Sequence, residues 1–595
     1  MPKYSVNQYP VSSILTWVKD KEIAVPEIQR PFVWSTIQVR DLMDSLYRGY
    51  PIGYIITWKN PDVRLKDGSK SQGKKVVIDG QQRITAMRAA ILGMSVVNKD
   101  YAEERIYIAF HPIKEEFATL TPAIERDSSW VPDISTIVSK ETGLFEEVNN
   151  YCEANPDVDK KLVEKNIEKL REIRNSPVGY IELDAGLDID VVTDIFIRIN
   201  SQGTVLSQAD FTMSKIASYG DFGVNLRKLI DYFCHLAVEP QFYDRIKQND
   251  SEFSKGEYLE KIAWLKNEID DLYDPSYADM VRVSFTKEFE RGKLSDLVSL
   301  LAGRNFETKT FEQVIQEGTF RRLEESLLEF SNETNFKRFV MIIKSTGFIS
   351  SDLITSQTIL NFAYILYLKL KEKNYSPGTI EKFVKKWFVM SLLTGRYSGS
   401  AESTIDNDIK GIANNGVEKE LKIIEDGELS RAFWVTSLVS ELEKASLSNP
   451  FINVFFASQV KNNEEGFLSK DITVSSLIQH RGDVHHIFPK EYLKSNGLNR
   501  GDYNQIANFC CAQSEINIKV GKKAPKDYFK EIKNQCQGGK LKYGNIDSLG
   551  DLKINMGKHC IPETIFDMGF DNYFDFLEER RRLMAKKIEK YYKSL

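Results

Sequence analysis

Apolar and polar positions alternate along the first hundred residues in patterns that change from helical to strand-like spacing. Ser35 and Gln38 form a capping-box pair before an apolar stripe of helical spacing, and Gly49 stands where a helix-ending glycine belongs. Two short apolar runs and a helical run follow, the last ended by Gly93. The pattern predicts, in chain order, helices over 11–17 and 35–46, strands over 53–58 and 75–78, and a helix over 84–92.

The rest of the chain divides by pattern into three parts. Strands are expected over 107–110 and 178–183, and a helix over 190–199, whereas the stretch from about 231 to 445 is almost wholly helical in spacing. Within it, five large apolar residues recur at helical spacing and indicate core rather than a base-stacking surface: Phe383, Trp387, Phe388, Met390 and Leu392. We expect domains at 1–230, 231–448 and 449–595.

Length and composition exclude several classes of protein. A chain of 595 residues is too long to fold around a single hydrophobic core, because a domain usually contains ~100 to 200 residues. A net charge of -5 means that any surface for nucleic acid is local. No apolar run approaches the ~18 residues of a membrane span and no signal peptide is evident, so a cytoplasmic location is expected. The six cysteines form no Cys-x-x-Cys pair, and we expect them to be reduced.

The sequence Asp79-Gly80-Gln81-Gln82-Arg83 lies in a predicted strand-to-helix turn. Backbone amides at the start of a helix favour an anion, and an arginine there adds a bidentate phosphate donor. The alternative is a structural Asp-Gly turn with a solvated arginine.

Three segments, 29–34, 79–83 and 196–203, resemble the DUF262 family in that order. The resemblance implies a ParB and sulfiredoxin-like N-terminal domain that binds and hydrolyses a nucleoside triphosphate (NTP). It implies a nucleotide site made of Gln29, Arg30, Asp79, Gly80, Gln81, Gln82, Arg83, Arg198 and Asn200. For the last two, a helix C-cap is the alternative.

Three of the six histidines fall between His480 and His486, within a segment that ends Val-His-His-Ile-Phe-Pro-Lys490. An imidazole titrates near ~6.5, so one member of an adjacent pair can accept a proton from water at neutral pH while the other binds a metal. Neighbours on a regular strand face opposite sides, so both can serve one phosphate only at a strand end or an irregular turn. Asn517 follows downstream. A surface histidine pair in a loop is the alternative.

The order of these residues, over roughly 481–529, resembles the ββα-metal HNH nucleases, specifically the DUF1524 subgroup at the C-terminus of GmrSD-type restriction proteins. The resemblance implies a catalytic set in which His486 is the general base, His485 and Asn517 bind a divalent metal, and Asn508 braces the loop. Many such enzymes carry Asp where His485 stands. Besides Mg²⁺ or Mn²⁺, the site would therefore accept Ni²⁺ or Zn²⁺.

Basic residues gather near the chain's end. Residues 481–530 hold nine Lys or Arg against five acids, which suits a phosphate backbone. A basic helical run over 578–593 is either a solvated face or a DNA contact.

The expected fold class is α+β multidomain: a ParB/sulfiredoxin-like domain, a helical middle domain and a ββα-metal HNH domain. The expected function is a nucleotide-regulated, metal-dependent endonuclease of a modification-dependent anti-phage restriction system. Its partners would be double-stranded DNA, in particular modified phage DNA, and NTP, with a homo-oligomer as a further expectation. The alternative is a nucleotide-switched, ParB-like DNA-binding or scaffold protein whose HNH fold does not cleave.

Overall fold

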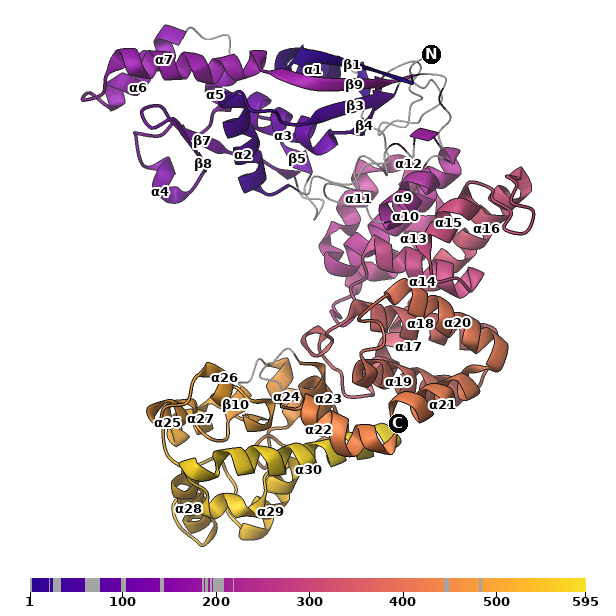
Figure 1. Ribbon diagram of the computed structural model, residues 1–595, viewed down its shortest axis with the longest axis vertical. Coiled ribbons are helices and arrows are strands. Elements are labelled where there is room, and N and C mark those ends of the chain that lie inside the picture. The colour runs from indigo at the N-terminus through magenta and orange to yellow at the C-terminus, as the bar shows by residue number, and fades with distance from the viewer. Residues whose placement is uncertain are drawn as a thin grey trace. The chain divides into compact units, whose positions relative to one another are not determined.

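The computed structural model (Figure 1) forms two compact units, Met1–Lys228 and Leu229–Leu595, here called the N-terminal unit and the C-terminal unit. It describes residues 3–20, 22–24, 34–58, 75–97, 103–139, 144–184, 187, 191–192, 195, 208–217, 219–443, 449–480 and 484–595. Most of the predicted helix over 190–199 lies outside the described residues. The predicted boundary at 448 lies within the C-terminal unit and stays a prediction.

A five-stranded mixed sheet organises the N-terminal unit. In spatial order its strands are β1 (Tyr4–Pro10), β9 (Pro177–Leu183), β3 (Tyr54–Trp58), β4 (Lys75–Asp79) and β2 (Ile23–Ala24). The edge strand β1 is antiparallel to β9, with Tyr4 opposite Leu183 and Pro10 opposite Pro177. Strand β3 runs parallel to β9 and antiparallel to β4, while β2 is parallel to β4. Asp79, the last residue of β4, therefore lies beside β3.

Alternate residues of β3 pack on opposite faces of this sheet, as the two-residue period of a strand requires. Ile55 joins the main core, which contains buried residues of β9 and of the three helices that span residues 11–19, 36–47 and 81–92. Ile56 and Trp58 join a smaller cluster on the other face with Leu183. The helices of this unit are α1 (Val11–Lys19), α2 (Thr36–Tyr47), α3 (Gln81–Leu92), α4 (Pro122–Glu125), α5 (Ser135–Val138), α6 (Leu144–Ala154), α7 (Lys160–Arg171) and α9 (Gln208–Ala217).

The local predictions in this unit are confirmed with small shifts of boundary. Ser35 caps α2 through the capping box with Gln38, and Gly49 follows the helix with φ 73°. Helix α3 begins three residues earlier than predicted, because Gly80 takes a left-handed conformation and lets the helix start directly after β4. The short strands outside the main sheet are β5 (Val96–Val97), β6 (Glu103–Glu104), β7 (Ile108–His111) and β8 (Glu116–Thr119), of which β7 answers the prediction over 107–110.

From residue 220 to 443 the secondary structure of the described chain is almost wholly helical, as predicted for about 231–445. The helices are α10 (Gly220–Val238), α11 (Tyr243–Asn249), α12 (Ser251–Lys255), α13 (Glu257–Lys261), α14 (Tyr277–Phe289), α15 (Leu294–Leu301), α16 (Gln313–Phe330), α17 (Glu333–Lys344), α18 (Gln357–Glu372), α19 (Pro377–Thr394), α20 (Ala401–Asn415), α21 (Val417–Glu428) and α22 (Leu438–Glu441). All five residues predicted as core on α19 are buried, so the core interpretation is confirmed. Arg396, just after α19, is also internal: it pairs with Asp408 of α20 and Glu428 of α21.

The remaining chain builds a small hairpin surrounded by helices. Its elements are α23 (Pro450–Lys461), α24 (Val474–Gln479), β10 (Val484–His486), α25 (Lys490–Ser495), α26 (Arg500–Tyr503), β11 (Phe509–Cys511), α27 (Ser514–Val520), α28 (Pro525–Cys536), α29 (Leu549–Lys558) and α30 (Tyr573–Lys593). Figure 1 shows α30 as the long yellow helix of this region. All six cysteines are free thiols, as expected. In the described part of the chain, no helix combines the length and apolarity that crossing a membrane requires.

Candidate active site and nucleotide site

Strands β10 and β11 place the two candidate histidines. In their antiparallel register His485 lies opposite Cys510 and His486 opposite Phe509. Directly opposed residues share a face, so the two imidazoles start from opposite faces of the hairpin. His486 is the last residue of β10, and the chain leaves the strand after it. His485 is only 4% exposed and His486 is partly buried, so the alternative of a surface pair in a loop is wrong.

Asn508 is fully buried and binds the loop that follows β10. Its Oδ1 accepts a hydrogen bond from the Phe488 amide (2.8 Å), and its Nδ2 donates to the carbonyls of Phe488 and Tyr503 (both 3.1 Å). These contacts tie the segment after His486 to the end of α26. Asn508 has no exposed surface, so within the predicted catalytic set it can position the loop but cannot touch a substrate.

The His486 ring is enclosed by aromatic side chains and by an amide. Its centroid lies 4.9 Å from Phe509 and 6.2 Å from Tyr503, both in edge-on geometry. Nε2 lies 2.9 Å from Oδ1 of Asn504, the residue that ends α26. Nothing in the sequence distinguished Asn504, since asparagines in loops are common and this contact spans eighteen residues.

Burial lowers the pKa of His486 below its usual value. The positive charge of Lys490 and the neighbouring His485 act in the same direction, while the hydrogen bond with Asn504 opposes them. A lowered pKa keeps the imidazole neutral at pH 7, the state in which it accepts a proton.

The residues expected to bind a metal differ in exposure: His485 is buried in β10, whereas Asn517 is exposed on α27, which follows the hairpin. Among the described residues no three His, Cys, Asp or Glu side chains group as a metal site, and Asp483 lies outside them. The amide oxygen of Asn517 is a ligand type that suits Mg²⁺ or Mn²⁺, whereas the imidazole of His485 is one that suits Zn²⁺ or Ni²⁺. The joint assignment of His485 and Asn517 stays a prediction.

Two arginines of the C-terminal helix α30 form hydrogen bonds with the connection between β10 and β11. Arg580 is fully buried, and its guanidinium donates to the carbonyls of Ala507 (2.7 Å) and His559 (3.0 and 3.2 Å). Arg581 donates to Oε1 of Gln505 (3.2 Å). Both alternatives for the basic run over 578–593, a solvated face and a DNA contact, are therefore wrong for these two arginines. Arg582, by contrast, has a 66% exposed side chain.

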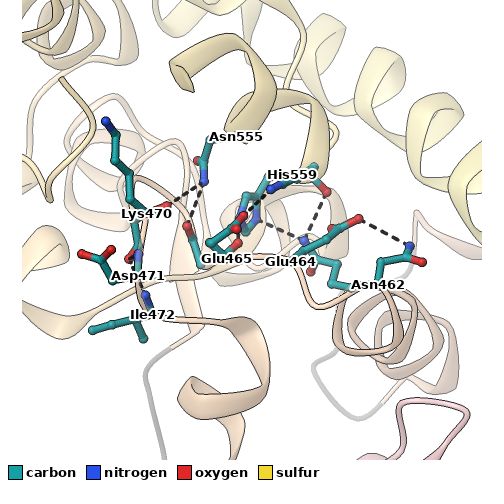
Figure 2. A network of polar contacts seen from close by, with 12 residues as sticks. Asn462, Glu464, Glu465, Lys470, Asp471, Ile472, Asn555 and His559 are labelled. Carbon is teal, nitrogen blue, oxygen red and sulfur yellow. Dashed lines mark hydrogen bonds and ion pairs between the residues drawn. The ribbon is translucent and has the colours of Figure 1, made fainter. Parts of the chain in front are cut away.

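A second buried polar network lies beneath the helix α29 (Figure 2). His559 Nε2 lies 3.0 Å from the Glu465 carbonyl, and Asn555 donates to the Gly466 carbonyl (3.0 Å) while accepting from the Leu468 amide (2.9 Å). Burial lowers the pKa of His559 to about 3. His559 is thus a neutral structural residue, and the Arg580 bond to its carbonyl joins this network to the hairpin.

In the N-terminal unit, the strand-to-helix turn brings Asp79 and Arg83 together. Arg83 Nη1 donates to Asp79 Oδ2 (3.2 Å) and to the Tyr54 carbonyl of β3 (2.9 Å). Gly80 has φ 97°, and a Cβ there would lie 3.1 Å from the Ile55 side chain. Glycine therefore permits both the turn and the close approach of β3.

The other predicted nucleotide-binding residues are only partly placed. Gln81 is buried at the first position of α3, and Gln82 follows it, partly buried. Four residues lie outside the described part of the chain: Gln29, Arg30, Arg198 and Asn200. Of the alternative, a structural Asp-Gly turn with a solvated arginine, the turn is present at Gly80, whereas Arg83 is 27% exposed and paired with Asp79 rather than solvated.

Comparison with known proteins supports the family expected for the N-terminal part of the chain. Residues 12–217 match the family described as GmrSD restriction endonuclease, N-terminal domain. This match falls within the N-terminal unit and includes the strand-to-helix turn. A protein of Methanocaldococcus jannaschii, described as uncharacterized, is 22% identical over 623 residues, covering 95% of this chain and 96% of the relative. The likeness thus extends to the C-terminal unit, for which this relative carries no functional description.

Proposed function

We propose that the protein is a nucleotide-regulated, metal-dependent DNA endonuclease of the modification-dependent restriction class. The observation that carries the proposal is the hairpin β10–β11 followed by α27, with His485 and His486 on the first strand and Asn517 on the helix. This is the order of strand, strand and helix expected of a ββα-metal nuclease. The match of residues 12–217 to a restriction endonuclease domain supports DNA as the substrate.

In the proposed reaction His486 accepts a proton from the attacking water. The water oxygen bonds to phosphorus, the bond from phosphorus to the 3′ oxygen breaks, and the leaving oxygen takes a proton from solvent. His485 and Asn517 would hold a divalent ion, whose chemistry is to neutralise charge on the leaving oxygen. Asn508 and Arg580 keep the loop around His486 in place through their hydrogen bonds to main-chain groups.

For the N-terminal unit we propose an NTP site at the turn from Asp79 to Arg83. The start of α3 offers backbone amides to a phosphate, and Arg83 offers a guanidinium already oriented by Asp79 and the Tyr54 carbonyl. Gln29, Arg30, Arg198 and Asn200 would complete it. A nuclease left uncontrolled would cut its own host's DNA, so nucleotide binding is the proposed control. For the fraction of molecules in a cleavage-competent state to rise from about 1% to 99%, the nucleotide must bind that state more tightly than the other by ~5.5 kcal/mol. Several phosphate contacts can supply this difference.

The test is cleavage of plasmid and of modified phage DNA by the full chain with Mg²⁺ or Mn²⁺, with and without NTP. His486→Ala is expected to lower the rate by ~10²- to 10⁴-fold, as the loss of a general base does. His480→Ala is the matched control, because His480 is exposed and near the hairpin in sequence, and it should cleave normally. Full cleavage by His486→Ala would end the nuclease assignment. DNA and NTP binding without cleavage by the wild type would favour the ParB-like scaffold.

A further inference from the structure

A ring nitrogen of His486 contacts the side chain of Asn504, which lies on the connection between β10 and β11. Asn504 Oδ1 lies 2.9 Å from Nε2. The side chains of the preceding residue, Tyr503, and of Phe509 on β11 pack edge-on against the same imidazole ring. The imidazole plane and one of its nitrogens are thus set by residues that sequence motifs do not mark.

Asn504 is itself held on both sides by side chains from elsewhere in the fold. The Tyr503 carbonyl accepts from Asn508 (3.1 Å), and the Asp502 carbonyl accepts from the Tyr573 hydroxyl (2.9 Å). Gln505 Oε1 accepts from Arg581 of α30 (3.2 Å). These bonds hold the main chain just before Asn504 and the side chain just after it, and so keep Asn504 beside His486.

We propose that Asn504 is the positioning residue of His486 and selects the ring tautomer in which Nε2 carries the hydrogen. A neutral imidazole has one N–H donor and one acceptor nitrogen, so an acceptor at Nε2 leaves the lone pair on Nδ1. Nδ1 is then the atom that receives the proton from water. The inference rests on the proposed function for this last step, whereas the tautomer itself does not depend on it.

The kinetic test compares Asn504→Leu with Asn504→Asp in DNA cleavage. Leu removes the acceptor, and we expect kcat to fall by ~10- to 100-fold with KM unchanged, the usual range for a residue that orients a functional group. Asp keeps an acceptor oxygen and should recover most of kcat. Asn496→Leu is the matched control, since Asn496 is exposed on the same connection and its side chain donates to the Tyr492 carbonyl, and this variant should match the wild type. Wild-type kcat in Asn504→Leu would overturn the proposal.

A spectroscopic test separates this inference from the nuclease assignment. Full-length protein labelled with ¹⁵N-histidine, at about pH 8 where an ordinary imidazole of pKa ~6.5 is neutral, shows which ring nitrogen carries hydrogen. His486→Gln identifies the His486 signals. We expect the Nε2–H form in wild type and Asn504→Asp, and a mixture in Asn504→Leu. An Nδ1–H form in wild type would overturn the inference, whereas the Nε2–H form in a protein that cleaves no DNA would overturn only the proposed function.

Discussion

The two candidate sites are built in different ways. The N-terminal one is local: Asp79, Gly80 and Arg83 belong to one strand-to-helix turn, and the outside contact is the Tyr54 carbonyl on the adjoining strand. The C-terminal one is assembled from distant segments, with His486 held by Asn504 and the connection between strands held by Arg580. The difference teaches that a local turn can offer backbone amides and one side chain, whereas orienting an imidazole requires hydrogen bonds from residues that are distant in the sequence.

The two constructions respond differently to mutation. In the turn, changing Arg83 removes a charged donor but leaves the strand and helix paired and packed. Around the hairpin, the supporting groups are themselves buried and polar, so removing one leaves main-chain partners unsatisfied. Effects on stability should therefore be larger in the C-terminal unit, and effects confined to ligand binding should be cleaner in the N-terminal unit.

The largest expected effect is on cleavage by His485→Ala and Asn517→Ala. Loss of a metal ligand removes several kcal/mol of charge stabilisation, or ~10²-fold or more in rate. Excess Mg²⁺ or Mn²⁺ should restore part of the rate in these variants and none in His486→Ala. Cleavage rates measured across a metal titration check this, and identical metal dependence in all three variants would contradict separate roles for the two histidines.

The next largest effect is expected from Arg580→Met, which should lower the unfolding free energy of the C-terminal unit. Methionine fills much of the volume but leaves the Ala507 and His559 carbonyls without their donor, at a cost of about 2–5 kcal/mol for two buried acceptors. Arg582→Met, two residues away on the exposed side of α30, should change the unfolding free energy by less than ~0.5 kcal/mol. Urea unfolding of both variants measures the difference, and equal stabilities would show that α30 does not support the hairpin.

A smaller effect is expected from Arg83→Ala on NTP binding. Loss of a charge-assisted hydrogen bond costs about 1.5–3 kcal/mol, or roughly 10- to 100-fold in affinity. Arg83→Lys should recover little, because an ammonium lacks the planar fork. Arg48→Ala is the matched control, since Arg48 forms the same kind of i,i+4 pair with Asp44 on α2.

The same Arg83 variant tests whether the two sites communicate. Its DNA cleavage with and without NTP should differ from that of the wild type even though His486 is unchanged. Normal NTP hydrolysis by Arg83→Ala would place the nucleotide site elsewhere. Cleavage rates equal to the wild type's under every condition would mean that the two sites act independently.

The smallest expected effect is a pH dependence from His559. Its pKa is lowered to about 3 in the folded chain by burial, against ~6.5 when unfolded, so only the unfolded state gains a proton as pH falls below ~6.5. The free energy of unfolding therefore keeps its full value above that pH, and below it decreases by up to ~1.4 kcal/mol per pH unit. His559→Gln should flatten this decline in thermal unfolding between about pH 6.5 and 5, while His480→Gln should not. Parallel curves for the two variants would show that another group dominates.

The sequence by itself determined the elements whose signals are local. The capping box of α2, the turn that ends β4 and the apolar stripe of α19 all depend on residues within a few positions of one another. Such spacing acts through neighbouring side chains and backbone hydrogen bonds, which form in the same way wherever the helix is placed. The order of His485, His486 and Asn517 could also be read from the sequence alone, because it depends only on positions along the chain.

Tertiary structure decided which of the remaining polar residues are internal. A basic run at helical spacing gives no sign that Arg580 is buried against two carbonyls while Arg582 faces solvent, because the partner surface comes from segments 21 and 73 residues away. The pairing of β1 with β9 and the contact of Asn504 with His486 also join separated parts of the chain. These choices depend on which faces meet in the folded core, and no periodicity within one segment carries that information.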